Sequence, residues 1–508
     1  MTPDTIMTPG VRRKGRAVDT GSPSTRTRCR RLLNPPIVWL GCPRPWPRTA
    51  TRPPTPNNGV HMSHAGTRDR RTLSTEERKV LASTLAGTSI EWYDFFIYAQ
   101  AAGLVLAPLF FAPVSADAPG LATIISLATI GISFLFRPLG AVVAGRFGDR
   151  LGRKKMLVFT LVTMGAATSL IGLLPTYGEI GVAAPVALML LRIVQGFSAG
   201  GEWGGAALMS VEHAPRGRRG LFGAYPQIGV PIGLILATGV LWVMTTVTTP
   251  EEFEAWGWRV PFLLSALLVV LGYAIRRAVE ESPIFAEMLA RKKASSAPLR
   301  DLFRGNAKQV VLTALIFIAN NAAGYLVIAY FVSYGSTTLG LSRSSVLLAT
   351  VVASFGWLAS TLYGGALSDR IGRVRTFQIG YAFVFAWMIP LFLLVDTGEI
   401  VLFGAAILVL TLGLGLSYGP MSALYAEMFP VSVRYSGVSI GYALGAILGG
   451  AFAPTIAELL MQNTGWSGSI GLYIMLLSAI SFAAVTAVRE PRGADLGVTE
   501  GRTNAAAS

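Results

Sequence analysis

The stretch "GRFGDRLGRKKM" at residues 145–156 places several basic side chains and one acid between two strongly apolar runs. A closely similar stretch, "GALSDRIGRVR", returns at residues 365–375. Charged residues make up 14% of the chain and hydrophobic residues 52%, whereas charged residues are about a quarter of a typical soluble domain. The composition therefore predicts a polytopic membrane protein.

The body of the chain, from about residue 80 to 488, alternates apolar runs with short polar connections. A helix that crosses the membrane needs about 20 apolar residues, and twelve runs meet this requirement. They are residues 82–111, 121–145, 156–174, 181–209, 220–246, 258–276, 308–336, 345–366, 376–395, 399–423, 436–461 and 469–488. We therefore predict an all-α membrane protein with 12 transmembrane helices.

The basic residues of the connections are distributed unevenly. The connections after the second, fourth, sixth, eighth and tenth spans carry nearly all of the Lys and Arg between spans, whereas only Arg259 and Arg343 lie at the opposite ends. Because short basic loops stay on the cytoplasmic side of a membrane, both termini are expected in the cytoplasm. The expected location is the cell membrane.

The first 61 residues differ in kind from the body, since they are rich in Arg, Pro and Thr and contain 11 basic and 2 acidic residues. Such a segment cannot bury an apolar core, so residues 1–79 are predicted to form a disordered tail. A nucleic-acid arm, a tether to anionic lipids and a transit peptide are conceivable roles. A translation start at Met62 is the favoured alternative, and no nucleic-acid partner is expected.

Cysteine and histidine are scarce in the membrane body. Cys29, Cys42, His61 and His64 all precede it, which leaves His213 as its only histidine. The sequence therefore excludes a disulfide framework and argues against a Cys or His metal site or a catalytic triad. A phosphate-binding Gly-Lys-Ser/Thr loop is also absent, so ATP is not the expected energy source. We expect neither a cofactor nor an enzymatic activity.

Two six-span halves are predicted from a long basic connection and from repeated signals. The connection, residues 277–307, separates a first half at 80–276 from a second half at 308–488, and a short tail follows at 489–508. Asp149, Arg150, Gly152 and Arg153 return as Asp369, Arg370, Gly372 and Arg373, and Glu212, Pro215 and Arg219 return as Glu427, Pro430 and Arg434. Positive-inside anchoring explains the arginines but not the repeated acids, glycines and prolines. Internal duplication is typical of an alternating-access transporter.

The repeated stretch resembles the loop between spans two and three of the major facilitator superfamily, "GxxxDRxGRR". Gly145, Asp149, Arg150, Gly152 and Arg153 carry the likeness. Glycines permit a tight turn there, the acid can face a helix N-terminus and the arginines can face helix C-termini. In that family the loop acts as a cytoplasmic gate. The resemblance therefore implies a gating role for these residues, for their second-half copies and for the Glu and Arg residues that repeat beside them.

Longer segments narrow the resemblance to the metabolite:proton symporter family. They are "GTSIEWYDFFIYA" at 87–99, "FLFRPLGAVVAGRFGDRLGRKKML" at 134–157, "LRIVQGFSAGGEWGGAALMSVEHAPRGRRG" at 191–220 and "WGWRVPFLLS" at 256–265. Within that family, the sequence resembles those of shikimate transporters most. The second half departs more, especially "IFIANNAAGYLVIAYFVSYG" at 316–335.

Ionisable residues inside the spans are candidate site residues, because each costs about 2.5–3.5 kcal/mol at mid-helix. Glu91, Asp94 and Tyr98 share one face of the first span, and Arg137 in the second span is at a depth where it could pair with Glu91 or Asp94. A carboxyl that gains and loses an arginine partner between states can bind and release a proton. Asp94 is therefore the predicted proton site, with Glu91 second.

Arg192 lies near the middle of the fourth span and shares a face with Gln195. In the superfamily the arginine of this "RxxQG" pattern is associated with proton coupling, and the resemblance implies that role for Arg192. We expect Arg137 and Arg192 to attract a substrate carboxylate, with Gln195, Tyr98 and Glu202 nearby. Static buried ion pairs involving Asp94 or Glu202 are the structural alternative.

Polar and aromatic residues of the second half are weaker candidates for substrate contact. Asn321 and Tyr325 are the main ones, and Asn320, Tyr330, Trp357 and Tyr418 accompany them. They could hydrogen-bond a hydroxylated ring acid. The alternative is that they serve as packing residues or interfacial anchors, which is common for Tyr and Trp in spans.

The expected function is proton-coupled uptake of a small organic acid, such as shikimate, by alternating access in the lipid bilayer. Citrate, 2-oxoglutarate, proline or betaine are alternative substrates, and a proton-antiporting exporter is an alternative mechanism. The expected partners are the organic acid and protons, and the protein is expected to function as a monomer. Sodium coupling stays open at this point.

Overall fold

The computed structural model describes residues 75–111, 121–151, 153–200, 202–215, 217–277, 298–430 and 433–493. Within these ranges it describes the backbone, but not the side chains, of residues 75–80, 83, 144–151, 153–157, 275–277 and 298–301. All of them belong to one compact unit. Nearly all of the predicted tail, most of the predicted linker and Gly152 lie outside the described residues.

The first half consists of helices joined by short connections. In chain order they are α1 (Thr75–Ala101), η1 (Ala102–Phe111), α2 (Leu121–Leu151), α3 (Arg153–Leu173), α4 (Tyr177–Ile180), α5 (Ala183–Ala199), α6 (Glu202–Glu212), α7 (Arg219–Val247), α8 (Pro250–Glu252), η3 (Phe253–Gly257) and α9 (Arg259–Arg277). The segments labelled η are π-helical, and π-helical turns are frequent at functional sites.

The second half has the same character. Its helices are α11 (Pro298–Gly305), α12 (Ala307–Tyr325), η4 (Leu326–Tyr330), α13 (Phe331–Ser333), η5 (Tyr334–Thr338), α14 (Arg343–Ile371), α15 (Arg373–Val395), α16 (Ile400–Tyr418), α17 (Met421–Met428), α18 (Arg434–Gly449), α19 (Ala453–Thr464) and α20 (Gly468–Thr486). The first long helix of each half changes from α-helical to π-helical geometry part-way along, after α1 and after α12.

Among the described residues, ten helices are long and apolar enough to cross a membrane. An eleventh is formed if Pro250–Gly257 and Arg259–Ala274, which meet at a bend of 42°, make one span. The remaining predicted span, at 156–174, coincides with the shorter apolar helix Val158–Leu173. The predicted all-α membrane fold is therefore confirmed, and each predicted span coincides with a helical segment.

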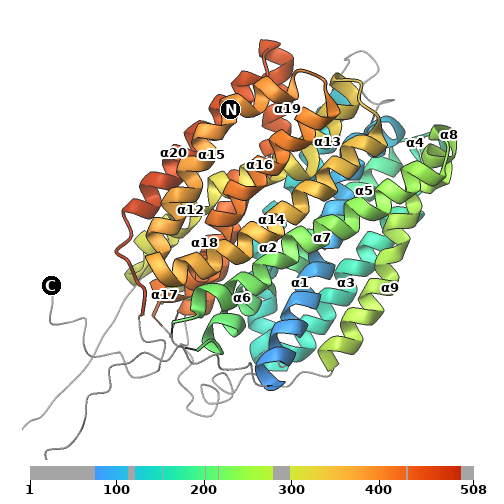
Figure 1. The fold of residues 1–508 in the computed structure, drawn as a ribbon. Helices are drawn as coiled ribbons and strands as arrows, with labels where there is room; N and C mark the ends of the chain where they lie inside the picture. Colours follow the sequence, from blue (N-terminus) through green and yellow to red (C-terminus); the bar gives the residue numbers. More distant parts are fainter. Residues whose placement is uncertain are drawn as a thin grey trace, which may run out of the picture. The chain divides into compact units, whose positions relative to one another are not determined.

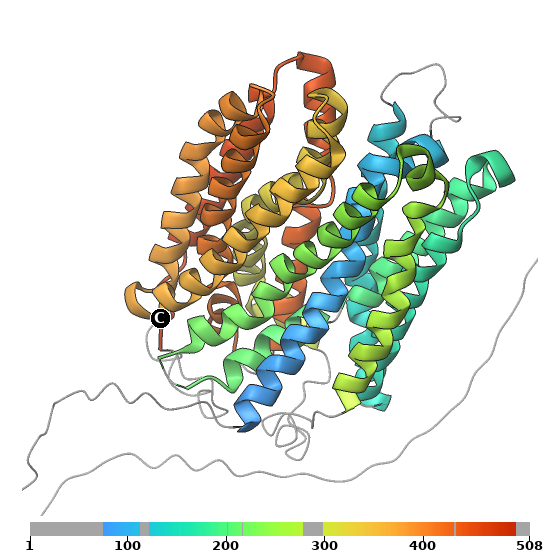
Figure 2. The same ribbon diagram turned by 45° about the vertical axis from the view of Figure 1, so that its right-hand side comes forward.

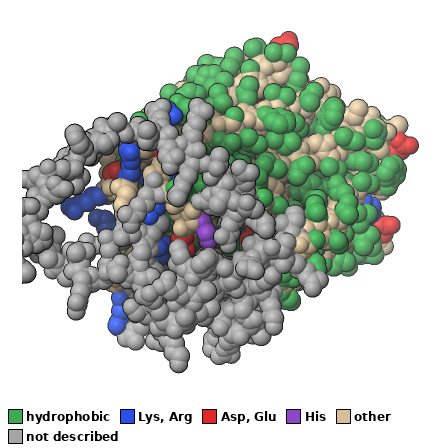
Figure 3. Space-filling view, turned by 60° about the horizontal axis from the view of Figure 1, so that its bottom comes forward, with side chains coloured by type: hydrophobic (Ala, Val, Ile, Leu, Met, Phe, Trp, Pro, Cys, Tyr) green, Lys and Arg blue, Asp and Glu red, His purple; other side chains and the backbone are tan. Residues whose placement is uncertain are grey.

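The two halves form two groups of helices that lie side by side (Figures 1 and 2). The helices α7 and α14 pack against each other along this boundary, and α1 also packs against α7. Hydrophobic side chains cover the flank of the molecule, whereas basic side chains and a histidine gather at one end (Figure 3). On the flank Leu393 is 70% exposed and Val401 77% exposed. Such exposure suits contact with lipid tails, which are as apolar as leucine.

Glycines allow α2 and α5 to touch through their backbones. A Cβ added to Gly196 would lie 1.9 Å from the carbonyl oxygen of Ser133, and one added to Gly200 would lie 2.0 Å from that of Arg137. Small residues at four-residue spacing are the usual device for close packing of membrane helices. This contact fixes α2, and therefore Arg137, against the helix that carries Arg192.

Replacing Gly196 with valine should destabilise the protein, because the added side chain cannot fit without separating α2 from α5. We expect a loss of about 1–3 kcal/mol, the usual cost of overpacking, seen as a lower unfolding temperature in detergent. The matched control is Gly239→Val on α7, since a Cβ at Gly239 meets nothing within 4 Å. Equal stability of the two variants would contradict this packing account.

Candidate functional site

Arg192 is fully buried in the first half, and its hydrogen-bond partners are neutral groups. Its Nη1 donates to Gln195 Oε1 at 2.6 Å, and its Nη2 donates to Ser133 Oγ at 2.8 Å. The guanidinium carbon lies 3.8 Å from the centre of the Tyr98 ring, within the range of a cation–π interaction. No described carboxylate forms an ion pair with Arg192. The prediction that Arg192 and Gln195 share a face is confirmed.

Asp94 is 1% exposed and faces the interior of the first half. Its Oδ1 accepts a hydrogen bond of 2.5 Å from Ser265 Oγ on α9. Thr168 on α3 is a further polar neighbour of the carboxyl, and Thr168 Oγ1 accepts a hydrogen bond of 2.6 Å from Gln195 Nε2. A row of polar groups therefore runs from Asp94 through Thr168 and Gln195 to Arg192.

Arg137 is 4% exposed and is enclosed by aromatic rings. Its guanidinium carbon lies 4.2 Å from the ring centre of Phe95 and 4.3 Å from that of Phe134. Its Nε and Nη2 atoms have no hydrogen-bond partner among the described groups. The predicted pairing of Arg137 with Asp94 is not formed between these described side chains, because Asp94 faces α3 and α9 while Arg137 faces the aromatic rings.

The other predicted site residues are also buried. Glu91 is near enough to Tyr325 to interact with it electrostatically, and Glu202 is the first residue of α6. Asn321 on α12 donates from Nδ2 to the carbonyl oxygen of Ala446 at 3.1 Å. Tyr98 shares a hydrogen bond of 2.5 Å with Thr129 Oγ1.

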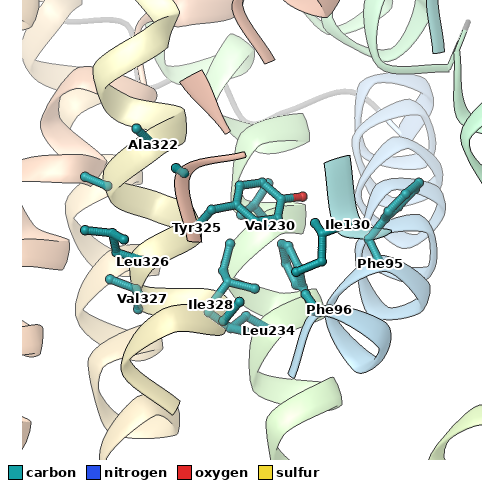
Figure 4. Packing of buried hydrophobic residues seen from close by; sticks show 14 of the residues in the cluster. Phe95, Phe96, Ile130, Val230, Leu234, Ala322, Tyr325, Leu326, Val327 and Ile328 are labelled. Carbon is teal, nitrogen blue, oxygen red and sulfur yellow. The ribbon is translucent and has the colours of Figure 1, made fainter. Parts of the chain in front are cut away.

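A small cavity lies between the halves, at the level of Tyr325. Its volume is about 20 Å³, which is room for about one water molecule. The lining residues are Trp92, Phe96, Val230, Phe317, Asn320, Asn321, Gly324, Tyr325, Ile328, Trp357, Tyr418 and Tyr442. Figure 4 shows Tyr325 extending from the second half toward Phe95, Phe96 and Ile130 of the first half. An organic acid cannot enter this cavity unless the halves separate.

An aromatic stack crosses between the halves beside this cavity. The rings of Trp203 in the first half and Tyr442 in the second half are stacked, with centroids 3.7 Å apart. Tyr442 also stacks on Phe317 at 4.5 Å, and Trp203 Nε1 donates to Gln227 Oε1 at 2.8 Å. The sequence did not single out Trp203 or Tyr442, since an aromatic residue in an apolar span gives no local signal of a cross-half contact.

A charged cluster joins the halves at one end of the bundle. We call this end the basic end and define it by Glu212, Arg219, Asp369, Arg373, Glu427 and Arg434. The carboxylate of Asp369 accepts hydrogen bonds from the backbone N–H groups of Gly220 at 2.8 Å and Leu221 at 2.9 Å. These are the first turns of α7, where unpaired N–H groups favour an anion. The prediction that the acid of the repeated turn faces a helix N-terminus is confirmed for Asp369.

Arg373 anchors this cluster from the same turn. Its Nη1 lies 2.7 Å from Asp369 Oδ1, and its Nε lies 3.2 Å from Glu427 Oε2. Gly372, which precedes it, has φ +103°, a conformation that strains other residues. The glycine therefore allows the sharp turn that places Asp369 and Arg373 side by side.

Two further ion pairs join the halves, and the half that supplies the arginine in one pair supplies the glutamate in the other. Arg219 of the first half lies 3.6 Å from Glu427 of the second, and Arg434 of the second half lies 3.6 Å from Glu212 of the first. Glu212 and Arg219 are the repeat equivalents of Glu427 and Arg434. The two contacts are therefore the same contact made twice, with the halves interchanged.

The other predicted gating residues take part in fewer of the described contacts. Arg370 is exposed, and its carbonyl oxygen accepts a hydrogen bond of 2.8 Å from Arg492. The structure does not describe the side chains of Asp149, Arg150 and Arg153. Gly145 is described only in its backbone, and Gly152 lies outside the described residues. Glu490 accepts from the backbone N–H groups of Arg373 and Val374 at 3.0 Å each.

The halves also touch at the opposite end of the bundle. The hydroxyl groups of Thr246 on α7 and Ser344 on α14 are 3.2 Å apart, and Arg343 lies 3.6 Å from Glu254. The halves thus touch at both ends of the bundle. In the described part of the chain no three His, Cys, Asp or Glu side chains come together as metal ligands.

The family of the chain follows from comparison with known proteins. Residues 95–447 match the profile of the family described as Major Facilitator Superfamily. The chain belongs to this superfamily. It is therefore a multi-pass membrane transporter and not an enzyme.

Several curated relatives within the superfamily are similar over most of their length. The inner membrane metabolite transport protein YhjE of Escherichia coli (strain K12) is 40% identical over 420 residues, which cover 82% of this chain and 94% of that protein. The shikimate transporter of the same organism is 37% identical over 429 residues, covering 83% and 96%. Its proline/betaine transporter is 32% identical over 422 residues, covering 81% and 83%.

Solved structures of the superfamily share the fold. The proton:xylose symporter XylE bound to 6-bromo-6-deoxy-D-glucose superposes with a TM-score of 0.68 at 17% identity, covering 83% of this chain and 98% of that one. A partially occluded inward-open conformation of XylE from E. coli gives a TM-score of 0.65 at 18% identity, covering 83% and 100%. At such identities the likeness concerns the fold alone.

Reversing one charge at the basic end should open this end, and reversing both partners should close it again. Glu212→Arg or Arg434→Glu alone places like charges together, whereas the double variant restores an ion pair. The reporter is Ser422→Cys, a fully buried position beside Gly223 of the other half, with Cys29 and Cys42 replaced by serine. We expect each single variant to react about 2- to 10-fold faster with a maleimide.

The double variant should return the labelling rate to that of the reporter protein. Ser342→Cys, at an exposed position before α14, serves as the control that shows that the reagent is not limiting. Labelling of Ser422→Cys that is unchanged in both single variants would show that the ion pair does not hold the basic end closed.

Proposed function

We propose that the protein is a proton-coupled symporter that takes up a small organic acid, such as shikimate, by alternating access. The observation that supports this most is the pair Arg137 and Arg192. Both are buried at membrane depth, and neither forms an ion pair with a described carboxylate. A buried charge without a counter-ion is costly, so an anionic substrate is the natural partner for this region.

Asp94 is the proposed proton site. It is the buried carboxyl at the end of the polar row that leads to Arg192, so a change at Arg192 can reach it through Gln195 and Thr168. When Asp94 is ionised, its negative charge offsets part of the positive charge of the two arginines. When Asp94 binds a proton, the region becomes more positive and attracts a carboxylate. Proton and substrate therefore favour each other's binding, which is the requirement for symport.

The basic end is the proposed cytoplasmic gate. Both halves carry the repeated basic turns there, and basic loops stay in the cytoplasm. The ion pairs between the halves and the contact of Asp369 with α7 keep this end closed while the opposite end opens. When substrate and proton are bound, these contacts break and the two six-helix halves rock about the central cavity. The termini are then both cytoplasmic.

The substrate assignment draws on the relatives. A shikimate transporter and a proline/betaine transporter are both similar to the chain, and the buried arginines favour an organic acid over a zwitterion. Antiport of protons against an exported compound is the second candidate mechanism. It uses the same gate, and the direction of the pH dependence separates the two.

The direct test is uptake of radiolabelled shikimate by proteoliposomes that contain the purified protein. An inward proton gradient should drive accumulation above the external concentration, and a protonophore should abolish it. Competition with citrate, 2-oxoglutarate, proline and betaine ranks the alternatives in the same vesicles. Efflux driven by an inward proton gradient would instead establish antiport and overturn the proposal.

Asp94→Asn should abolish accumulation driven by a proton gradient but retain exchange of labelled for unlabelled substrate. The reason is that exchange needs substrate binding and movement of the halves but no net proton transfer. Asp396→Asn is the control, because Asp396 lies at the far end, where it accepts hydrogen bonds from Tyr334 and Ser467. Normal proton-driven accumulation by Asp94→Asn would remove Asp94 from the coupling mechanism.

A further inference from the structure

Five buried side chains that line two cavities between the halves have polar atoms without a hydrogen-bond partner among the described groups. The atoms are Arg137 Nε and Nη2, Trp92 Nε1, Tyr325 Oη, Trp357 Nε1 and Ser439 Oγ. Trp92, Tyr325 and Trp357 line the central cavity, and Arg137 and Ser439 line a smaller cavity that shares Tyr442 with it. Every one of these groups can donate a hydrogen bond. Buried donors normally find acceptors, so this region is prepared for a ligand rich in oxygen acceptors.

The two unpartnered nitrogens of Arg137 form one edge of its guanidinium group. The N–H bonds of Nε and of Nη2 point in parallel from that edge, which is the arrangement that binds both oxygens of a carboxylate. Arg192 differs, because its Nη1 and Nη2 already donate to Gln195 and Ser133. Its Nε lies 3.5 Å from the carbonyl oxygen of Thr129. Only one guanidinium of the pair is therefore open to a ligand carboxylate.

The aromatic rings around Arg137 hold the group in place without using its hydrogen bonds. Phe95, Phe134 and Trp92 approach the guanidinium within 5.5 Å of their ring centres. Phe134 also packs edge-on against Tyr325 of the second half, with centroids 5.3 Å apart. Tyr325 and Arg137 interact electrostatically. The guanidinium of Arg137 and the ring of Tyr325 thus share Phe134 as a neighbour and belong to one small region.

We propose that Arg137 is the single carboxylate anchor of the transport site and that Trp92, Tyr325 and Trp357 donate hydrogen bonds to further oxygens of the same ligand. This deepens the proposed function and rests on its claim that the cargo is an organic acid. The ligand class is a small monocarboxylate whose body carries hydroxyl or carbonyl oxygens. Its apolar faces pack against Phe96, Phe317 and Tyr418.

The same arrangement selects against other candidate cargoes. A tricarboxylate would bring more than one negative charge to a region with one open guanidinium edge. A compact zwitterion such as betaine would place a cation beside Arg137 and leave the donors of Tyr325 and Trp357 unpaired. A site built to hydrogen-bond a substrate rejects analogues that lack the acceptor.

The donors come from both halves, which gives the ligand a second role. Arg137 and Trp92 belong to the first half, whereas Tyr325 and Trp357 belong to the second. A ligand that binds all four joins the halves, and one that binds only Arg137 does not. Hydroxyl groups on the cargo therefore contribute to closing the protein as well as to affinity.

The test is equilibrium binding to the full chain purified in detergent, at one pH and without any gradient. The two probes are shikimate and cyclohex-1-enecarboxylate, which keeps the ring and the carboxylate but lacks the hydroxyls. Arg137→Lys retains a charge but loses the parallel pair of donors, so it should weaken both probes by roughly 10- to 100-fold. Arg304→Lys, at an exposed position of α11, is the matched control and should bind both probes as the unmodified protein does.

Tyr325→Phe should separate the two probes. It should weaken shikimate about 5- to 10-fold and leave cyclohex-1-enecarboxylate unchanged, because only shikimate has a hydroxyl to accept from Tyr325. Tyr363→Phe, on the exposed flank of α14, is the control for loss of a phenolic hydroxyl. Each variant is compared only after its unfolding temperature and elution volume match those of the unmodified protein.

Several outcomes would overturn the assignment. They are unchanged binding by Arg137→Lys, equal weakening of both probes by Tyr325→Phe, tighter binding of citrate, proline or betaine than of shikimate, or no binding of any probe by folded protein. These results are distinct from failure of the proposed function, because binding is measured without a proton gradient. Binding that follows the predicted pattern in a protein that does not accumulate substrate would support the site and reject proton symport.

Discussion

Arg192 needs hydrogen-bond acceptors inside the membrane, because the guanidinium of arginine is not deprotonated in proteins and keeps its charge there. The packing of the first half depends on providing these acceptors to Arg192. Neutral oxygens of Gln195 and Ser133 accept its hydrogen bonds, and the Tyr98 ring covers its face. Ser133 is close enough because Gly196 lets α2 touch α5. The same approach places Arg137 beside the boundary between the halves. The need to surround the Arg192 guanidinium with acceptors thus fixes the spacing of α2 and α5, which carry Arg137 and Arg192.

Much of the fold could be predicted because the signals are local. The length of an apolar run and the position of basic residues depend only on neighbouring sequence, so the spans and the second-half copy of the repeated turn were found correctly. The turn at Gly372 is an example, since an acid, a glycine and an arginine in that order specify the geometry seen at Asp369. The 42° bend before Arg259 was not predicted, because no hydrophobic period reports a π-helical turn.

The site could be predicted only as a set of residues. The cost of burying a charge in a membrane identifies Asp94, Arg137 and Arg192 from sequence alone. It does not say which groups face each other, because this depends on the rotation of each helix about its axis. Asp94 faces Ser265 rather than the expected arginine, and the stack of Trp203 on Tyr442 joins residues that no local pattern connects.

The exchanged ion pairs of Glu212 with Arg434 and of Arg219 with Glu427 have an evolutionary consequence. In a symmetric dimer of identical subunits, a residue i that contacts j implies a second contact of j with i. A six-helix ancestor with one glutamate and one arginine at these positions would have formed both bridges at once by pairing with a second copy of itself. In such a dimer a single mutation would have altered both bridges together. In one fused chain the two copies are separate, so each bridge can change independently.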